Sequence, residues 1–253
     1  MKVLPLSLSV SAEAVSLIAF HGFTGGGLDF EPLAQGSDRL RWYAPEWSCL
    51  ENVAKIICSI DEFLVQQNIK KAIFMGYSMG GRIALHYALA RPQHVHKLIL
   101  IGATPGIECA EERLARCQAD NELADIALSD GASYFIDRWQ QHPLIKTQKL
   151  RINKNIYEAM LQRRYALSPE TLAHELRVFG TGVMQNYWPY LGDVSCPTML
   201  ITGEEDNKFR DIALRMCTLI KNAQHFEISF SGHAAHLENL DFSRSLIEQW
   251  SLV

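Results

Sequence analysis

The chain has 253 residues, of which 48% are hydrophobic and 21% are charged, and its net charge is −4. This length and composition fit one large α/β domain, with or without an inserted lid. The acidic balance and the lack of a basic tract argue against a nucleic-acid partner or an anionic membrane surface, and no run approaches the roughly 20 apolar residues of a membrane-spanning helix.

The six cysteines are scattered along the chain and lack the spacing of metal ligands. We therefore expect free thiols, a reducing cytoplasmic compartment and no metal site. Residues 1–6 are apolar, but they lack the long apolar core and the small-residue cleavage site of a signal peptide, so none is expected.

Apolar runs of strand length alternate with stretches of helical periodicity along most of the chain. Pro45, Gly102 and Gly203 follow or end such runs and mark strand ends. Strands that alternate with helices predict a largely parallel sheet covered on both faces, the α/β class. The expected strands are residues 15–20, 40–44, 71–75, 95–101, 196–202 and 225–230, and the expected helices are residues 50–67, 81–91, 211–219 and 242–250.

The strand signal disappears between about residues 108 and 190. This segment instead carries several stretches of helical periodicity with polar faces. An all-helical insertion between two strands of an α/β sheet predicts a cap over the active site. We therefore expect a core formed by residues 1–107 and 191–253, and a helical cap formed by residues 108–190.

Residues 76–80 have the pattern Gly-x-Ser-x-Gly, with Ser78 at its centre. An expected strand precedes the pattern, and an expected helix follows it as far as Pro92. A serine on a sharp turn from strand to helix is a nucleophile elbow, where a Cβ at either glycine would clash. The turn exposes the Ser78 hydroxyl and places the Met79 N–H at a helix N-terminus, which favours negative charge.

A serine hydroxyl needs a neighbouring imidazole to act as a nucleophile or base, and the imidazole needs a carboxylate that holds its tautomer. The chain order around an elbow of this type is Ser, then Asp or Glu, then His. Asp206 and His233 fit that order, since each follows the end of an expected strand. Sites in open parallel sheets form at these carboxyl ends of strands.

Three residues compete for the roles of Asp206 and His233. Glu204 and Glu205 are alternative acids in the same loop, and Asp206 is preferred because the extra residues let the loop turn back. His236 is the alternative base, and His233 is preferred because it directly follows the glycine at the strand end.

The loop of residues 21–27, His-Gly-Phe-Thr-Gly-Gly-Gly, follows the first expected strand. We expect its Phe23 N–H to pair with the Met79 N–H as an oxyanion hole, because two preorganised donors stabilise a developing oxyanion. His21 is expected to pack beneath this loop and not to act in catalysis.

The elbow, the oxyanion loop and the loops of Asp206 and His233 together resemble the α/β-hydrolase superfamily across essentially the whole chain. The chain also resembles a narrower family, the 2-succinyl-6-hydroxy-2,4-cyclohexadiene-1-carboxylate (SHCHC) synthases of menaquinone biosynthesis. The segments that carry this resemblance are residues 76–82 (GYSMGGR), 203–209 (GEEDNKF) and 232–239 (GHAAHLEN). Within the expected cap they are residues 111–116, 137–139, 172–177 and 180–182, followed by Trp188.

The resemblance implies a lyase that eliminates pyruvate from 2-succinyl-5-enolpyruvyl-6-hydroxy-3-cyclohexene-1-carboxylate to give SHCHC. Ser78 would act as a base within the triad, on a small polycarboxylate substrate and without a cofactor, since proton transfer and elimination need none. A serine hydrolase, either a carboxylesterase or a C–C bond hydrolase, would use the same triad and is the alternative. A ligand receptor without catalytic activity is a third hypothesis, and the complete triad argues against it.

Arginine binds carboxylates through its planar fork of donors. Arg82 lies one helical turn beyond Ser78, so the two side chains are expected to face the same pocket. The resemblance implies that Arg82, Arg116 and Arg164 bind the carboxylates of the substrate and that Tyr77 and Trp139 shape the pocket. Arg113 is a close rival of Arg116, and Arg163 is a close rival of Arg164.

The sequence departs from the superfamily in one loop. Residues 43–47, Tyr-Ala-Pro-Glu-Trp, replace the Asp-x-Pro-Gly-His-Gly loop that is common there. The resemblance therefore does not determine the shape of one pocket wall, and a different substrate on the same frame stays open as an alternative.

Overall fold

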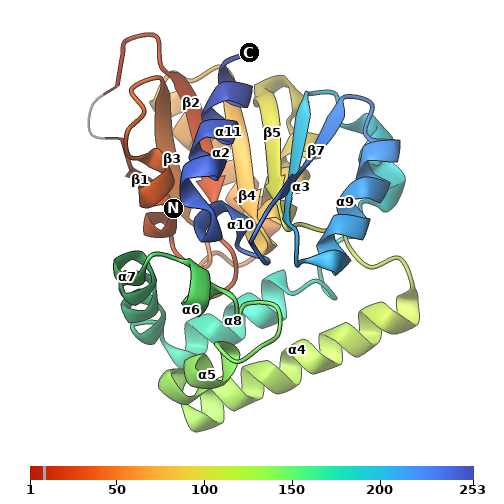
Figure 1. Ribbon diagram of the computed structural model, residues 1–253. Helices are drawn as coiled ribbons and strands as arrows, with labels where there is room; N and C mark the ends of the chain where they lie inside the picture. Colours follow the sequence, from red (N-terminus) through yellow and green to blue (C-terminus); the bar gives the residue numbers. More distant parts are fainter. Residues whose placement is uncertain (8–9) are drawn as a thin grey trace.

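The computed structural model describes residues 1–7 and 10–253. Within these residues seven strands form one sheet in the order β1-β3-β2-β4-β5-β6-β7 (Figure 1). Strands β2 to β7 run parallel, and β1 pairs antiparallel with β3 at one edge. The strands are β1 (Lys2–Pro5), β2 (Val15–Phe20), β3 (Leu40–Glu46), β4 (Ala72–Tyr77), β5 (Val95–Ile101), β6 (Thr198–Gly203) and β7 (Ala223–Ile228).

Helices cover both faces of the sheet, because successive side chains of a central strand point to opposite sides. In β4, Phe74 packs into one apolar core, while Ile73 and Met75 pack into the other. The first core is closed by α2 (Val53–Gln66), α3 (Met79–Ala90) and α9 (Asn207–Leu219), and the second by α1 (Glu31–Ala34), α10 (Ala235–Glu238) and α11 (Leu240–Leu252).

The segment between β5 and β6 is helical and gathers at the carboxyl end of the parallel strands (Figure 1). We call this segment, which contains five α-helices, the insert. Four of these helices contribute to a small apolar core that includes Phe135, Leu172 and Leu176, whereas the short helix of residues 148–151 does not. The insert consists of α4 (Ala110–Asp130), α5 (Ala132–Trp139), α6 (Gln148–Arg151), α7 (Lys154–Tyr165) and α8 (Pro169–Phe179).

The α/β fold and its parallel sheet confirm the class predicted from the sequence. The prediction missed one strand and several element boundaries: for example, α9 begins at Asn207 and not at residue 211, and β7 spans Ala223–Ile228 and not residues 225–230. The edge strand β1 was not foreseen, and β3 continues through Pro45 to Glu46 instead of ending at Ala44. Pairing between β1 and β3 explains both the extra strand and the longer β3. The pairs of β3 with β2 end at Tyr43, whereas Val3 of β1 lies opposite Pro45, so β1 extends the paired part of β3.

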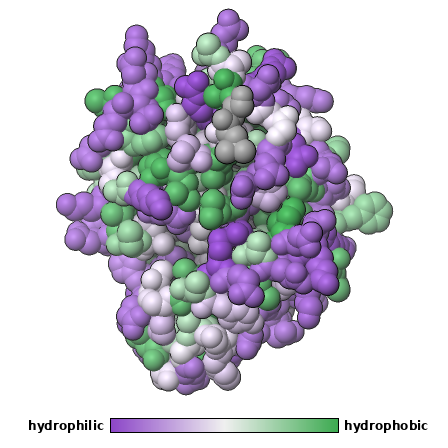
Figure 2. All heavy atoms as spheres, turned by 90° about the vertical axis from the view of Figure 1, so that its left-hand side faces the viewer, coloured by the Kyte–Doolittle hydropathy of each residue, from purple (hydrophilic) through white to green (hydrophobic). Residues whose placement is uncertain are grey.

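Figure 2 shows the β1 side of the molecule. Hydrophobic side chains gather in a few groups across the middle of this face, and hydrophilic side chains border them. Among the helices that the structure describes, none combines the length and the apolar character needed to cross a bilayer.

Candidate active site

Ser78 lies on a strained turn between β4 and α3. Its φ of 52° and ψ of −111° are values that a residue with a Cβ rarely adopts. The turn is held by a hydrogen bond of 2.8 Å from the Ser78 N–H to the carbonyl of Ile101. A Cβ on Gly76 would overlap the backbone of Gly80, and a Cβ on Gly80 would overlap the carbonyl of Phe20. The two glycines are therefore required by close backbone approach, as the elbow pattern predicts.

The structure brings Ser78, His233 and Asp206 together. His233 Nε2 lies 3.0 Å from Ser78 Oγ, and His233 Nδ1 lies 2.6 Å from Asp206 Oδ2. Because the carboxylate accepts, Nδ1 carries the proton and Nε2 is free to accept from the serine hydroxyl. His233 and Asp206 are both buried, so the hydrogen bond between them is shielded from water, whereas Ser78 is half-buried and faces the cavity.

The rival residues lie elsewhere. Glu204 accepts a hydrogen bond of 2.9 Å from the Phe230 N–H, and Glu205 forms an ion pair with Arg151. His236 is buried with its ring 4.6 Å from the ring of Tyr77, and burial together with nearby His233 lowers the pKa of His236 to about 3. His236 is therefore a neutral packing residue at physiological pH.

The oxyanion loop packs directly against the elbow. A Cβ on Gly22 would lie 2.9 Å from the ring of Tyr77, so a larger residue would push the loop away. Phe23 and Met79 line the same cavity as Ser78, and neither backbone N–H donates to an acceptor in the described part of the chain. Two free donors next to a serine hydroxyl are the arrangement that stabilises a developing oxyanion.

His21 lies behind this loop, as expected from the sequence. Its ring is buried and stacks on Trp47 at 4.9 Å between ring centroids, and Trp47 also makes an edge contact with Phe179 of α8. In the described ranges, none of residues 43–47 lines the cavity beside Ser78. Trp47 packs behind the oxyanion loop instead, and Glu46 accepts a hydrogen bond of 2.9 Å from the Gly27 N–H of that loop.

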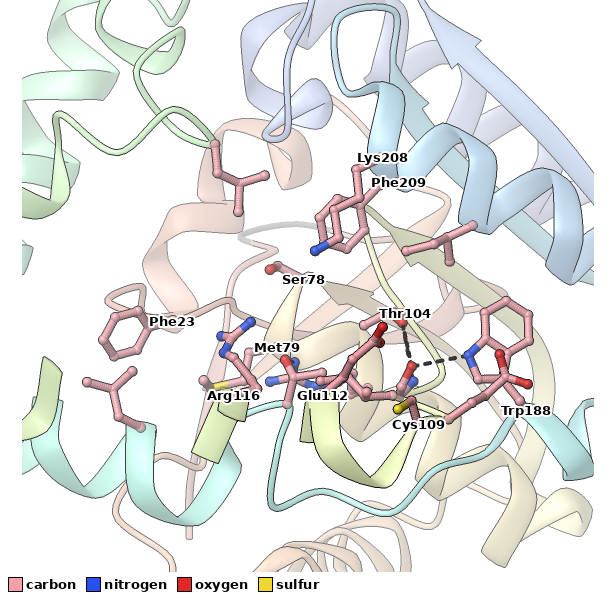
Figure 3. Close-up of a pocket in the computed structure, with 18 of the residues that line it drawn as sticks. Phe23, Ser78, Met79, Thr104, Cys109, Glu112, Arg116, Trp188, Lys208 and Phe209 are labelled. Atoms are coloured by element: carbon pink, nitrogen blue, oxygen red, sulfur yellow. Dashed lines mark hydrogen bonds between the residues drawn. The ribbon is translucent and has the colours of Figure 1, made fainter. Parts of the chain in front are cut away.

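The cavity beside Ser78 has a volume of about 550 Å³ and lies between the sheet and the insert. Lys208 and Phe209 lie on one side of Ser78, and Arg116 and Met79 lie on the other (Figure 3). The remaining lining residues are Phe23, Arg82, Thr104, Gly106, Ile107, Glu108, Cys109, Glu112, Trp139, Leu144, Leu176, Thr181, Trp188 and Ile212.

The arginines named from the sequence differ in their surroundings. Arg82 lines the cavity but is buried, and its guanidinium donates to Thr181 and, across 2.7 Å, to the carbonyl of Phe179. Arg116 lines the cavity and forms an ion pair of 2.9 Å with Asp120, one helical turn further along α4. Arg116 is the more available of the two, since its side chain is 42% exposed.

Arg164 lies in a separate small cavity of about 30 Å³, which Tyr77, Ser78 and His233 also line. Its Nη2 donates across 2.9 Å to Gln148, while Nε and Nη1 are buried without a partner among the described residues. A buried guanidinium with unpaired N–H groups destabilises the protein unless a ligand or water accepts their hydrogen bonds.

The rival arginines are engaged or distant. Arg163 donates across 2.7 Å to Asp29, next to the oxyanion loop. Arg113 does not line the main cavity in the part of the chain that the structure describes. Tyr77 is half-buried beside the triad, and desolvation raises the pKa of its hydroxyl. Trp139 lines both the main cavity and the small cavity of Arg164.

Two residues near the site were missed by the sequence reasoning. Lys208 lines the cavity at the start of α9, two positions after Asp206, and this position in the acid loop was the available signal. Glu175 of α8 is fully buried and accepts a hydrogen bond of 3.2 Å from the Thr24 N–H in the oxyanion loop. Nothing in the local sequence around Glu175 indicates that contact.

Comparison with known proteins places the chain in a family. The model of the α/β hydrolase fold family matches residues 15–240. A Bacillus subtilis (strain 168) protein, which carries the name 2-succinyl-6-hydroxy-2,4-cyclohexadiene-1-carboxylate synthase provisionally, is 31% identical over 90% of this chain and 86% of its own length. The synthase of that name from Salmonella typhimurium (strain LT2) is 27% identical over 88% of each chain.

Solved structures agree with these sequence relatives. The structure of MenH from S. aureus has a TM-score of 0.89 and 30% identity, and the match covers 98% of this chain and 96% of that one. A thermophilic esterase from Thermogutta terrifontis has a TM-score of 0.79 at 17% identity over 98% of this chain and 92% of its own, which indicates the shared fold alone. The chain thus belongs to the α/β-hydrolase fold family and, within it, to the family of the SHCHC synthases.

Proposed function

We propose that this protein eliminates pyruvate from 2-succinyl-5-enolpyruvyl-6-hydroxy-3-cyclohexene-1-carboxylate to give SHCHC, a step of menaquinone biosynthesis. The observation that carries the proposal is the identity of 30–31% with relatives of the synthase family over nearly the whole of both chains. The triad distances and the cavity beside Ser78 are compatible with it.

In the proposed reaction Ser78 acts as a base and not as a nucleophile. Ser78 Oγ takes a proton from a substrate carbon while its own hydroxyl proton passes to His233 Nε2. The electron pair of the broken C–H bond moves into the substrate, and the C–O bond to the enolpyruvyl group breaks. The leaving enolate takes up a proton and becomes pyruvate, while the N–H groups of Phe23 and Met79 stabilise the enolate-like charge in the transition state.

The substrate is a polycarboxylate, and the cations around the cavity support that choice. We propose that Arg116 and Arg164 bind its carboxylates, because Arg116 is partly exposed in the main cavity and Arg164 has two unpaired buried nitrogens beside the triad. Lys208 adds a further cation on the opposite wall from Arg116 (Figure 3). Arg82 is proposed to contribute charge to the cavity while its donors hold the insert.

The domain organisation is part of the same proposal. Residues 1–107 and 191–253 form the core, and residues 108–190 form a cap that closes the cavity, in which α4, α5 and α8 contribute lining residues. We also propose that the protein works in the cytoplasm. The six cysteines are free thiols, the state expected in a reducing compartment.

The test is the release of pyruvate from the enolpyruvyl precursor by the purified protein, followed by coupled oxidation of NADH with lactate dehydrogenase. We expect release with the unchanged protein and a large loss of rate with Ser78→Ala. No release at high enzyme concentration would contradict the proposed activity. Full activity of Ser78→Ala would contradict the role of the elbow.

Ester hydrolysis is the second candidate, because a serine hydroxyl 3.0 Å from an imidazole, next to two free N–H donors, also suits attack on an ester carbonyl. A panel of short-chain p-nitrophenyl esters, assayed beside the enolpyruvyl precursor, separates the two activities. Fast ester turnover without pyruvate release would select the hydrolase.

A further inference from the structure

Glu238 makes a set of contacts around the triad histidine that its position in the sequence does not explain. Its carboxylate is completely buried. It accepts hydrogen bonds from the N–H groups on either side of His233, at 2.8 Å from Gly232 and 3.3 Å from Ala234. A single carboxylate therefore holds the backbone N–H groups of both residues adjacent to His233.

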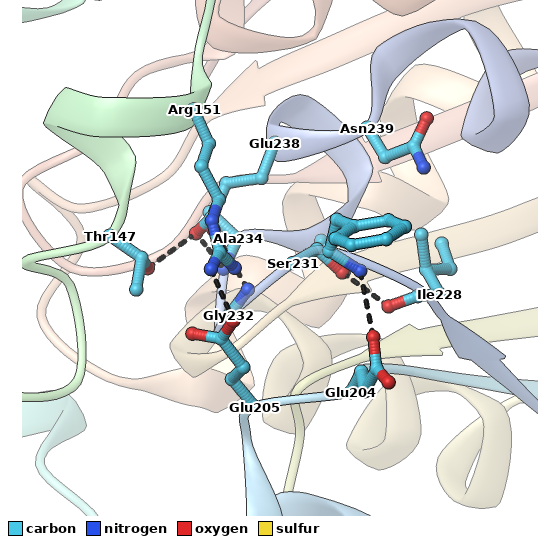
Figure 4. Close-up of polar contacts among 12 residues, drawn as sticks. Thr147, Arg151, Glu204, Glu205, Ile228, Ser231, Gly232, Ala234, Glu238 and Asn239 are labelled. Atoms are coloured by element: carbon cyan, nitrogen blue, oxygen red, sulfur yellow. Dashed lines mark hydrogen bonds and ion pairs between the residues drawn. The ribbon is translucent and has the colours of Figure 1, made fainter.

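The insert supplies the other partners of Glu238 (Figure 4). Thr147, which precedes α6, donates a hydrogen bond of 3.0 Å to Glu238 Oε1, and Arg151 Nη1 at the end of α6 lies 3.8 Å from Glu238 Oε2. The approach is so close that a Cβ on Gly232 would overlap the Thr147 hydroxyl. The α6 segment thus rests directly on the histidine loop.

Arg151 also joins the two loops that complete the triad. Its other terminal nitrogen, Nη2, forms an ion pair with Glu205, the residue before Asp206. The Glu205 N–H in turn donates across 3.0 Å to the carbonyl of Ser231 in the histidine loop. One arginine of the insert therefore lies between the acid loop and the histidine loop.

The burial of Glu238 makes these partners important for its stability. A buried carboxylate is stable only when hydrogen bonds and an opposite charge replace its lost water. If α6 moved away from the core, Glu238 would keep two backbone donors and lose both its hydroxyl donor and its nearby cation. The loop that carries His233 would then lose part of what orients it.

We propose that Glu238 is a positioning residue for His233 and that α6 of the insert completes its hydrogen bonding, so that docking of α6 and alignment of the triad are one event. The inference rests on the Ser78 triad of the proposed function and not on the identity of the substrate. Gln148 of the same helix accepts from Arg164, so a carboxylate bound at Arg164 would also hold α6 in its docked position.

The test compares Thr147→Val, Arg151→Gln and Glu238→Gln with Lys149→Gln, a matched control that removes an exposed cation of the same helix. We expect kcat for pyruvate release to fall about 10- to 100-fold in Glu238→Gln and less in the two α6 variants, with KM little changed, because a small misplacement of a reacting group has a cost of this order. Lys149→Gln should behave as the unchanged protein.

A second measurement does not depend on the substrate. In protein with ¹⁵N-labelled histidine, the downfield Nδ1 proton of the His233–Asp206 hydrogen bond should shift or broaden in the Thr147, Arg151 and Glu238 variants and stay unchanged in Lys149→Gln. An unchanged signal and unchanged kcat in folded Glu238→Gln would overturn the proposal. If that variant does not fold, the same result in both α6 variants would overturn it. If the unchanged protein releases no pyruvate, the proposed function fails, and the NMR signal alone tests whether Glu238 positions His233.

Discussion

Arg82 Nη2 donates a hydrogen bond of 2.7 Å to the carbonyl oxygen of Phe179, which joins the helix after the elbow to the last residue of α8. The guanidinium also donates to Thr181, beyond the end of α8. Burial, with the nearby Arg116 as a smaller cause, lowers the pKa of Arg82 to about 9. A side chain selected from the sequence as a substrate ligand therefore also holds the insert to the core.

We expect Arg82→Lys to lower the free energy of unfolding by about 1–3 kcal/mol, since lysine keeps the charge but leaves the Phe179 carbonyl and Thr181 without their donors. Denaturant unfolding and KM for the enolpyruvyl precursor are the measurements. Arg177→Lys, which alters an exposed ion pair on α8, is the control and should change stability by less than about 0.5 kcal/mol. A raised KM with unchanged stability would show that Arg82 acts on the substrate alone.

The acid of the triad can be distinguished from its neighbours. Asp206→Asn should lower kcat by about 10³- to 10⁴-fold, because the amide no longer holds the His233 tautomer that accepts from Ser78. Glu204→Gln should leave kcat nearly unchanged, since Glu204 is exposed and accepts from a backbone N–H outside the triad. Pyruvate release at saturating substrate measures both variants. Comparable losses in the two would mean that the acid has been misassigned.

Substitutions of Arg163 and Arg164, which are neighbours in α7, should have different effects, one on stability and the other on substrate binding. Arg164→Met should raise KM by about 10- to 100-fold, the loss expected for a charged hydrogen bond of about 1.5–3 kcal/mol to a substrate carboxylate. Arg163→Met should instead lower stability, because it breaks the pair with Asp29, and should change KM less. Steady-state kinetics and thermal unfolding on both variants provide the comparison. A larger KM effect at Arg163 would reverse the assignment.

Glu175 predicts a dependence of stability on pH. Burial raises the pKa of its carboxyl from 4.5 to about 8 in the folded protein. Between these values the folded state binds more protons than the unfolded state, so the free energy of unfolding falls as pH rises toward 8. Several histidines have the opposite effect around and below pH 6.5, because the pKa of His236 is lowered to about 3 and that of four further histidines is also lowered. The contribution of Glu175 is therefore clearest in the upper part of the interval from pH 6.5 to 8.

Urea unfolding at several pH values in that interval tests the prediction. Glu175→Gln should remove most of the slope, whereas Glu170→Gln, an exposed change on the same helix, should retain it. A slope that survives in Glu175→Gln would mean that other groups set the pH dependence.

Local patterns were enough to predict most of the core and the positions of the site loops. Ser78, Asp206 and His233 follow β4, β6 and the region of β7, and a parallel sheet brings such loops to one edge. The roles of Glu238 and Glu175 could not be predicted, because each depends on contacts with residues of a distant segment. The boundaries of the insert helices were equally out of reach, since polar faces weaken the periodicity that marks a helix end.

Trp47 has a consequence for how the family can diversify. It stacks on His21 behind the oxyanion loop and touches α8 through Phe179, yet it lies apart from the cavity lining in the described residues. We expect mutations at Trp47 to alter how firmly the loop that carries the Phe23 donor is held, and mutations at cavity positions away from that loop to alter substrate choice. Trp47 and those cavity residues can therefore be engineered separately.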